Sequence, residues 1–512
     1  MGRAPRQRER SAHPQVHHDL PAFAGGAQGA RQRVRLAVRG RMVTEARMAN
    51  RKKILLNAFN MNCVGHINHG LWTHPRDRSA HYTDLDYWTD LAKTLERGKF
   101  DGIFLADIVG VYDVFGGGPE VALRESVQVP VNDPLLLVPA MAQVTRHLGF
   151  GVTANLTYEP PYLFARRMST LDHLTKGRIG WNIVTGYLDS AARGMGLARQ
   201  IGHDDRYERA DEYMDVVYKL WEQSWDDDAV IRDARARVFA RPDKVRRVKH
   251  DGPFYSIDAI HLSEPSPQRT PVLYQAGSSA RGVEFAGRHA ECVFVNGQSK
   301  AAARAAALDI RAAAARQGRD PASIRIFAGV SVVTAETERL AREKFDEYRR
   351  YASPEAGLAH FASSTGIDFA KYGLDEPISY VKTDSIQSAV DAISRKSTSG
   401  AWTVRRMLEQ MSLGGRYAPI VGSPSQVADE LQSWIDETGI DGFNLTRTVM
   451  PESFEDFVDC VVPELQNRGV YKEDYDPAPT LREKLFGAGA RLPAWHTGAQ
   501  HRPSAARESA HA

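Results

Sequence analysis

From Arg51 onward, short apolar runs alternate with stretches that carry apolar residues at helical spacing. The runs are rich in β-branched and aromatic residues, and this alternation predicts parallel strands joined by crossover helices. Eight runs are present: 54–59, 102–107, 149–156, 179–184, 271–277, 291–297, 324–333 and 442–446. Eight parallel strands close a barrel, so the predicted fold class is α/β, a TIM (β/α)8 barrel.

The segments between the runs carry helix signals. In 81–98, Leu85, Trp88, Leu91, Ala92 and Leu95 form one apolar stripe, and Gly98 predicts the helix end. Asn132 or Asp133 is expected to cap a helix that has Pro134 in its first turn. Two spacings, between the fourth and fifth runs and between the seventh and eighth, are too long for simple crossovers. They predict insertions in the βα loops, where barrel active sites lie.

Charge separates the front of the chain from the rest. Residues 1–53 hold 13 Lys and Arg against 3 Asp and Glu, whereas the whole chain has a net charge of only +3. We expect 1–50 to be a disordered or miscalled N-terminal extension, with a mitochondrial targeting peptide as the alternative. Residues 51–487 are expected to form the barrel domain, and 488–512 an irregular C-terminal tail. The mildly acidic body gives no nucleic-acid footprint.

Two further features bear on the compartment. No apolar run is long enough to span a membrane. The three cysteines, Cys63, Cys292 and Cys460, are too sparse for a disulfide framework. They favour a reducing compartment, and we expect a cytoplasmic protein.

Polar and aromatic residues follow the predicted strands, and in a barrel they face one common site. In chain order they are Cys63, His66, Asp107, Tyr112, Thr153, Asn155, Asn182 and Tyr187. A rim with a single carboxylate suits a large planar organic ligand better than metal hydrolysis. His66 and His69, in "MNCVGHINHGLW", have no matching ligand pair after the other strands, so we predict no metal site. The chain also lacks a GxSxG elbow and a GxGxxG fingerprint in strand–helix context.

A candidate phosphate site follows the fifth run. In "QAGSSARG" a strand ends and Ser278 and Ser279 lead into a helix, which places backbone N–H groups where a phosphate binds. The alternative is a plain serine N-cap. His203 and Tyr207 lie at another helix start, where His203 is either a phosphate donor or a surface residue. Asp107 is either a group that orients a ring or ribityl hydroxyl, or a helix cap.

Several long stretches resemble one family. "NAFNMNCVGHINHGLWTHP", "LERGKFDGIFLADIVGVYDV", "TYEPPYLFARRMSTLDHLTKGRIGWNIVT", "HDDRYERADEYMDVVYKLWE" and "EPSPQRTPVLYQAGSSARGVEFA" look like the bacterial luciferase-like flavin monooxygenases. The branch resembled contains the nitrilotriacetate and dibenzothiophene-sulfone monooxygenases. The loop after the first predicted strand, "MNCVGHINHGLW" (61–72, here called the front loop), is most similar to long-chain alkane monooxygenases, whereas 365–410 is more similar to dimethyl-sulfide monooxygenases.

The resemblance implies an enzyme that uses reduced FMN and O2, supplied with flavin by an NADH-dependent flavin reductase, and a homodimer or tetramer. It places FMN contacts on Asp107, Thr153, Asn155, His203, Tyr207, Ser278 and Ser279. It places substrate-side residues on Cys63, His66, Tyr112, Gln128, Asn182 and His360. Tyr187 departs from the histidine expected in the alkane enzymes.

The resemblance leaves the substrate open. Long-chain alkane hydroxylation is the first expectation, and oxygenation of an alkyl sulfide or another heteroatom substrate is the second. Sulfides are easier to oxidise than unactivated C–H bonds. His66 or His360 is expected to supply a hydrogen bond or a proton during oxygen transfer, and Cys63 to lie beside the flavin or to be a small buried residue. A non-catalytic flavin-binding barrel and a deazaflavin-dependent reductase are the alternatives from other classes.

Overall fold

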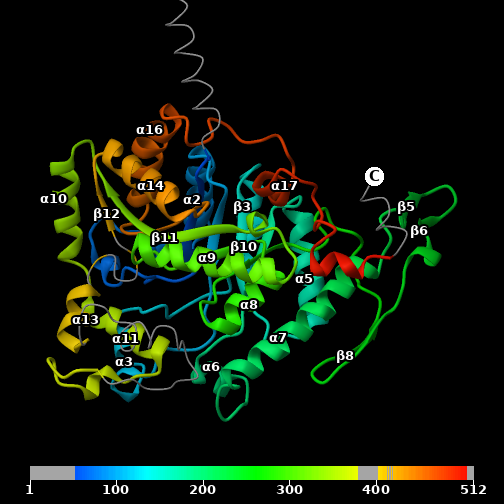
Figure 1. Ribbon diagram of the computed structural model, residues 1–512, viewed down its shortest axis with the longest axis horizontal. Coiled ribbons are helices and arrows are strands. Elements are labelled where there is room, and N and C mark those ends of the chain that lie inside the picture. The colour runs from blue at the N-terminus through cyan, green and yellow to red at the C-terminus, as the bar shows by residue number, and fades with distance from the viewer. Residues whose placement is uncertain (1–51, 379–401, 412, 414–416, 418, 504–512) are drawn as a thin grey trace, which may run out of the picture. The chain divides into compact units, whose positions relative to one another are not determined.

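Eight parallel strands form a closed barrel in the computed structural model, which describes residues 52–378, 402–411, 413, 417 and 419–503 (Figure 1). Each predicted run overlaps one strand, so the strand prediction is confirmed, although β1 and β11 extend past the predicted ends at 59 and 333. The strands are β1 Leu55–Met61, β2 Gly102–Ala106, β3 Gly149–Asn155, β4 Ile179–Val184, β9 Val272–Gln275, β10 Cys292–Val295, β11 Arg325–Thr334 and β13 Gly442–Thr446. The expected extension, 1–50, lies outside the described residues.

The pairing between β10 and β11 closes the barrel, and β1 pairs with both β2 and β13. A ninth parallel strand, β12 (Pro419–Gly422), pairs with the far end of β11. Sequence reasoning missed β12, because a run of four residues that begins with proline gives no strand signal.

Aromatic rings fill the barrel interior. Phe59 meets Phe104 at a ring-centroid distance of 5.6 Å, and Phe104 meets Tyr274 at 5.6 Å. A glycine on a neighbouring strand makes room for these rings, because a Cβ at Gly180 would lie 2.6 Å from the Tyr274 ring. The interior is therefore packed rather than open, as in other barrels of this kind.

Helices surround the barrel (Figure 1). They include α2 Leu85–Arg97, α4 Val138–Gln143, α5 Pro161–Leu174, α8 Ala280–His289, α9 Lys300–Arg316, α14 Pro424–Thr438 and α16 Val462–Asn467. The stripe on α2 is buried from Trp88 to Leu95, but Leu85, the first helical residue, is exposed. Asp133 is the cap before Pro134, accepting a bond from the Leu135 N–H, although the first turn is a 3₁₀ helix (η4, Pro134–Leu137).

Both predicted insertions are present. Between β4 and β9 the chain forms α6 (Asp189–Gly194), α7 (His203–Tyr218), a π-helical turn η5 (Lys219–Gln223) and two hairpins, β5–β6 (Val230–Asp233, Val238–Ala240) and β7–β8 (Val248–Asp251, Ser256–Ala259). Between β11 and β13 it forms α10 (Glu338–Arg349), α11 (Pro354–Thr365), α13 (Val404–Gln410), β12 and α14. Helix α11 lies near α3 (Glu120–Arg124) and α13 (Figure 1).

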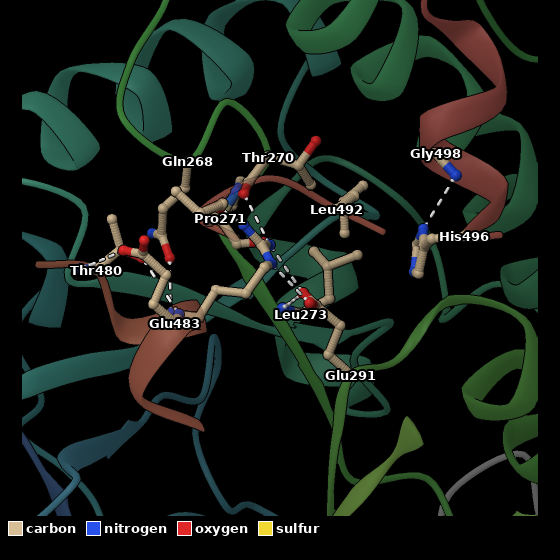
Figure 2. A network of polar contacts seen from close by, with 12 residues as sticks. Gln268, Thr270, Pro271, Leu273, Glu291, Thr480, Glu483, Leu492, His496 and Gly498 are labelled. Carbon is tan, nitrogen blue, oxygen red and sulfur yellow. Dashed lines mark hydrogen bonds and ion pairs between the residues drawn. The ribbon is translucent and has the colours of Figure 1, made fainter. Parts of the chain in front are cut away.

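A short helix, α17 (Leu481–Phe486), covers the end of the barrel where the strands begin. Its Arg482 is buried and pairs with Glu291, the residue before β10. Arg482 also donates to the carbonyls of Thr270 and Pro271, before β9. Figure 2 shows this network, in which Glu291 accepts the Leu273 N–H. A capping box formed by Thr480 and Glu483 begins the helix.

The residues after Gly487 pack on the helical layer. They contain a 3₁₀ helix, η10 (Thr497–His501), and a buried His496. Arg491 and Arg502 both pair with the buried Glu222 of η5. The division of the chain at residue 487 stays a prediction. No helix among the described residues is long and apolar enough to cross a membrane.

Candidate flavin and substrate site

A cavity of about 90 Å³ lies where β2, β3 and β4 end. Asp107 lines it from β2, Thr153 and Asn155 from β3, and Gly186 and Tyr187 from the loop after β4. The structure therefore brings together three of the predicted cofactor-binding residues, with Tyr187 beside them.

The carboxyl group of Asp107 is in an unusual state. Burial and the neighbouring charge of Asp133 raise its pKa to about 7, although the Ile108 N–H bond acts in the opposite direction. Asp107 therefore exchanges a proton near neutral pH. A group of this kind at the mouth of a barrel is typical of a functional site.

Two buried amide oxygens at the ends of adjacent strands have no hydrogen-bond partner among the described residues. Asn182 donates its amide N–H to the Thr153 hydroxyl at 2.8 Å, but its Oδ1 has no partner. Gln275, on β9, is 3% exposed and its Oε1 has none either. Strands β4 and β9 pair with Asn182 beside Tyr274 and Ile183 beside Gln275. A buried acceptor without a donor costs free energy, so each oxygen fits a group that donates an N–H or O–H. By this register the two side chains lie on opposite faces of the strands, Asn182 with Tyr274 and Gln275 with Ile183.

The substrate-side residues Tyr112, Gln128 and His360 form one cluster, although they come from three separate loops and helices. The Tyr112 hydroxyl donates to the Gln128 side-chain oxygen at 2.6 Å and lies 3.4 Å from the Tyr187 hydroxyl. The His360 ring stacks on the Tyr112 ring at a centroid distance of 4.9 Å. Through Tyr187, this cluster adjoins the cavity that Asp107 lines.

Apolar side chains surround these polar groups. Around Tyr112 and Tyr187 pack Ala122, Val127, Leu188, Ala191 and Ala356. The wall next to the cavity therefore offers an apolar environment that a few hydroxyl, amide and imidazole groups interrupt, as is usual for small-molecule sites.

The front loop carries Cys63 and His66 to the end of β1. The Cys63 thiol is buried and donates to the Gly65 carbonyl at 3.1 Å. Burial raises its pKa to about 12, which favours the neutral thiol near pH 7. His66 is 2% exposed, and its ring edge meets Phe59 at a centroid distance of 4.6 Å. The roles of Cys63 and His66 beside a flavin stay predictions.

Arg447, after β13, holds this loop in place. Its guanidinium donates to the carbonyls of Cys63 and Val64, and its own carbonyl accepts from the Asn68 side chain. Sequence reasoning missed Arg447 and Gln275. Both stand at or just after the end of a predicted strand, so the rule that identified Asp107 and Asn155 also points to them.

The predicted phosphate residues meet at the N-terminus of α8. Ser279 is the N-cap and accepts the Gly282 N–H at 3.1 Å, so the plain capping role is also present. The Tyr207 hydroxyl, from α7, lies against Gly277, where a Cβ would stand 2.7 Å from it. Gly277 is therefore required for close approach rather than for a positive φ. A hydroxyl beside an open helix N-terminus suits an anion.

His203 and Ser278 flank this cluster. The His203 ring lies 5.3 Å from the Tyr207 ring, and its Nδ1 is 2.8 Å from the Asp204 carboxylate. Ser278 precedes the cap and is exposed. The cluster stands at the end of β9, which pairs with β4, so it neighbours the cavity side of the barrel. Among the described residues, no group of three His, Cys, Asp or Glu side chains is arranged to hold a metal ion.

The chain is similar to known proteins over most of its length. Residues 67–442 match the family model described as "Luciferase-like monooxygenase". The chain is 50% identical over 453 residues to a dimethyl-sulfide monooxygenase from Hyphomicrobium sulfonivorans, covering 88% of this chain and 94% of that protein. It is also 50% identical over 452 residues to a long-chain alkane monooxygenase from Geobacillus thermodenitrificans (strain NG80-2), covering 88% and 98%.

Solved structures share the barrel. A crystal structure of a long-chain alkane monooxygenase superposes with a TM-score of 0.82 at 50% identity, covering 88% of this chain and 100% of that chain. A riboflavin lyase, whose crystal structure is described as containing modified FMN and riboflavin, superposes with a TM-score of 0.83 at 38% identity, with the same coverage.

Proposed function

We propose that the chain, which belongs to the luciferase-like monooxygenase family, binds reduced FMN and uses O2 to oxygenate a small hydrophobic molecule. The observation that supports the flavin best is the buried Asn182 Oδ1, which has no donor among the described residues and whose side chain bonds Thr153 at the edge of the cavity. A flavin ring and ribityl chain carry the N–H and O–H groups that would satisfy this oxygen.

Two groups of residues would bind different parts of FMN. Ser279, Tyr207 and His203 would hold the phosphate, with Ser278 beside them, and Asp107, Thr153 and Asn155 would face the ribityl chain or the ring edge. When bound, FMN supplies the activation of O2. The chain's own residues orient the flavin, exclude water with the apolar wall around Tyr112, and present His360 and Tyr112 toward the substrate side.

For the substrate, we propose long-chain alkanes first. All six residues that the alkane enzymes' pattern places on the substrate side are present, and Tyr112, Gln128 and His360 are in contact with one another or with a shared neighbour. Alkyl sulfides are the second candidate. Tyr187 is the reason to keep them, because the alkane enzymes are expected to have histidine at this position and the Tyr187 hydroxyl lies 3.4 Å from that of Tyr112, in the substrate-side cluster.

A substrate panel tests these proposals. The full-length protein is incubated with FMN, NADH, a flavin reductase and ¹⁸O2. Each reaction contains hexadecane, dimethyl sulfide, an aminocarboxylate or an aryl sulfone, and mass spectrometry identifies the products. An ¹⁸O-labelled alcohol supports the alkane proposal, and an ¹⁸O-labelled sulfoxide supports the sulfide proposal. If the protein binds FMN but gives no labelled product, the result supports the alternative of a non-catalytic flavin-binding barrel. If it does not bind FMN, the proposed flavin-dependent function is wrong.

A Tyr187→His variant discriminates between the two substrates. If Tyr187 selects sulfides, this variant lowers sulfoxide formation relative to alcohol formation. An unchanged ratio of the two products contradicts a selective role for Tyr187. The companion flavin reductase and a homodimer or tetramer belong to the same proposal, and size-exclusion chromatography with light scattering tests the assembly.

A further inference from the structure

His69 makes two contacts with the segment that carries His360. Its backbone carbonyl accepts the Ser353 N–H at 2.9 Å, just before the first residue of α11. Its ring Nε2 lies 3.0 Å from Nδ1 of His360, in the middle of the same helix. The two histidines are 291 residues apart in the chain. One residue of the front loop therefore fixes both the start of α11 and the side chain on its inner face.

The backbone is shaped for this approach. Gly70 has φ +89°, and a Cβ there would lie 2.5 Å from the Ser353 nitrogen. Only glycine adopts this conformation readily and leaves room for the hydrogen bond between the Ser353 N–H and the His69 carbonyl. His69 itself is 3% exposed and His360 is 5% exposed, so the bond between their rings is shielded from water. Such a bond is stronger than one at the surface.

Two facing imidazole nitrogens share one proton when both rings are neutral, so the pair decides which nitrogen of His360 carries hydrogen. If His69 donates from Nε2, then His360 accepts at Nδ1 and carries its own proton on Nε2. His360 is then a hydrogen-bond donor through Nε2 while its ring stays stacked on Tyr112. The opposite arrangement would make His360 Nε2 an acceptor, which cannot supply a hydrogen bond during oxygen transfer.

We propose that His69 is a positioning residue for the oxygenation: it donates to His360 and holds that ring, as the Nε2–H tautomer, against Tyr112. This inference rests on the proposed function, because His360 matters only if it serves the substrate side. It assigns to His69 a task beyond shaping the loop. The same logic applies to histidines at other active sites, whose orientation and tautomer depend on the partner of the second nitrogen.

Three substitutions test the bond. His69→Phe keeps the ring but removes both nitrogens, and kcat should fall by up to about 100-fold while the KM for substrate and the Kd for FMN change little. His69→Gln places an amide N–H close to the position of Nε2 and should recover much of the lost kcat. His69→Asn is too short to reach His360 and should resemble His69→Phe. If Gln and Phe variants lose the same activity, the bond is not what matters and the proposal is wrong.

A double-mutant cycle separates positioning from general damage. In a His360→Phe background, His69→Phe should cause almost no further loss of kcat, because the residue through which it acts has gone. Additive losses would overturn the proposal. His74→Phe is the matched control. His74 is also a buried histidine and lies five residues after His69, but its Nε2 contacts Glu347, 3.3 Å away on α10. This control should keep the kcat of the unmodified chain.

A readout on the flavin-free protein distinguishes failure of this inference from failure of the proposed function. In ¹⁵N-histidine spectra, the resonances lost in His360→Phe identify His360, and they should report the Nε2–H tautomer. His69→Phe should shift them or mix the tautomers, and His69→Gln should restore them. If His360 already has the Nδ1–H tautomer in the unmodified protein, the inference is wrong even when the enzyme oxygenates its substrate. If the tautomer is as stated but no substrate is oxygenated, the function fails instead.

Discussion

Ser279 has one observed task, as the N-cap of α8, and one proposed task, as a phosphate ligand. Its hydroxyl accepts the Gly282 N–H and begins α8, and it stands beside the Tyr207 hydroxyl at the proposed phosphate position. A serine N-cap contributes about 1 kcal/mol to stability, whereas a hydrogen bond to a charged phosphate contributes about 1.5–3 kcal/mol to binding. The two tasks therefore predict different measurements.

A Ser279→Ala, Tyr207→Phe double variant should bind FMN at least about tenfold more weakly, because two donors to the phosphate are lost. Fluorescence quenching of FMN gives the dissociation constant. Ser299→Ala is the matched control, because Ser299 caps α9 in the same way by accepting the Ala302 N–H. It should lose a similar cap stability but keep the FMN affinity. Unchanged affinity in the double variant would reject the phosphate assignment.

Asp107 predicts a pH dependence of stability. The pKa of its carboxyl group is about 7 in the folded protein, above its ordinary value of 3.8, so the folded state holds a proton that the unfolded state has lost. The contribution of protonated Asp107 to stability is fully present below about pH 4 and is lost as the pH rises through 7. Asp107→Asn cannot ionise. The free energy of unfolding of the unmodified protein, minus that of the variant, should therefore fall between pH 4 and 7.

Urea unfolding across this range measures that difference, whose slope is no more than about 1.4 kcal/mol per pH unit. Asp309→Asn, at an exposed position of α9, is the control and should leave the difference flat. A flat difference for Asp107→Asn as well would show that Asp107 is ionised throughout, and the assignment of a neutral pocket carboxyl would be wrong.

Residues at strand ends could be predicted, and contacts between distant loops could not. Asp107, Thr153 and Asn155 were identifiable because the eight strands are regular and their C-terminal ends meet at one site. The pairing of His69 with His360 depends on where the β11–β13 insertion folds back, which no local pattern encodes. Burial likewise decides the state of the Cys63 thiol, and the charged groups that act on it, Arg447 and Asp107, come from distant positions in the chain.

At the scale of elements, the barrel strands were predictable because each falls in a short apolar run followed by a helical segment, and the short helix α17 that covers the end of the barrel was not. The helix α17 is six residues long, and its role depends on one charged side chain, Arg482, reaching the start of β9 and β10. From the sequence alone, an arginine in a short helix is expected to be a surface residue. Only the structure shows that Arg482 is buried and paired with the Glu291 carboxylate, at the end of the barrel where the strands begin.

Arg482→Met should lower the free energy of unfolding by about 3–5 kcal/mol, because it leaves the Glu291 carboxylate buried without its partner. Adding Glu291→Gln should recover part of the loss, since glutamine removes the charge and still accepts the Leu273 N–H. Urea denaturation followed by tryptophan fluorescence measures both. Arg316→Met breaks an exposed pair with Glu284 and should cost less than about 1 kcal/mol. Equal effects at the buried and exposed pairs would contradict the account of α17.

At the scale of the whole molecule, the stability of the barrel depends on residues beyond the expected boundary at 487. Burial alone would raise the pKa of Glu222, but the charges of Arg491 and Arg502 hold it at about 2. Both arginines come from the last part of the chain that the structure describes, whereas Glu222 belongs to η5 in the β4–β9 insertion. His496, from the same segment, is buried and hydrogen-bonds the His289 carbonyl at the end of α8. Ion pairs therefore join the segment after 487 to η5, and a buried hydrogen bond joins the same segment to α8.

Deleting residues 488–512 should leave the Glu222 carboxylate buried and unpaired, and the truncated protein should unfold at lower urea or fail to accumulate in soluble form. The full-length Arg491→Met, Arg502→Met variant tests the same point where truncation yields no protein. Glu222→Gln should destabilise the full chain but stabilise this double variant, because in the latter it removes an unpaired charge. A Glu222→Gln effect of the same sign in both backgrounds would mean that the arginines are not its partners. The segment after 487 would then stabilise the molecule only by packing.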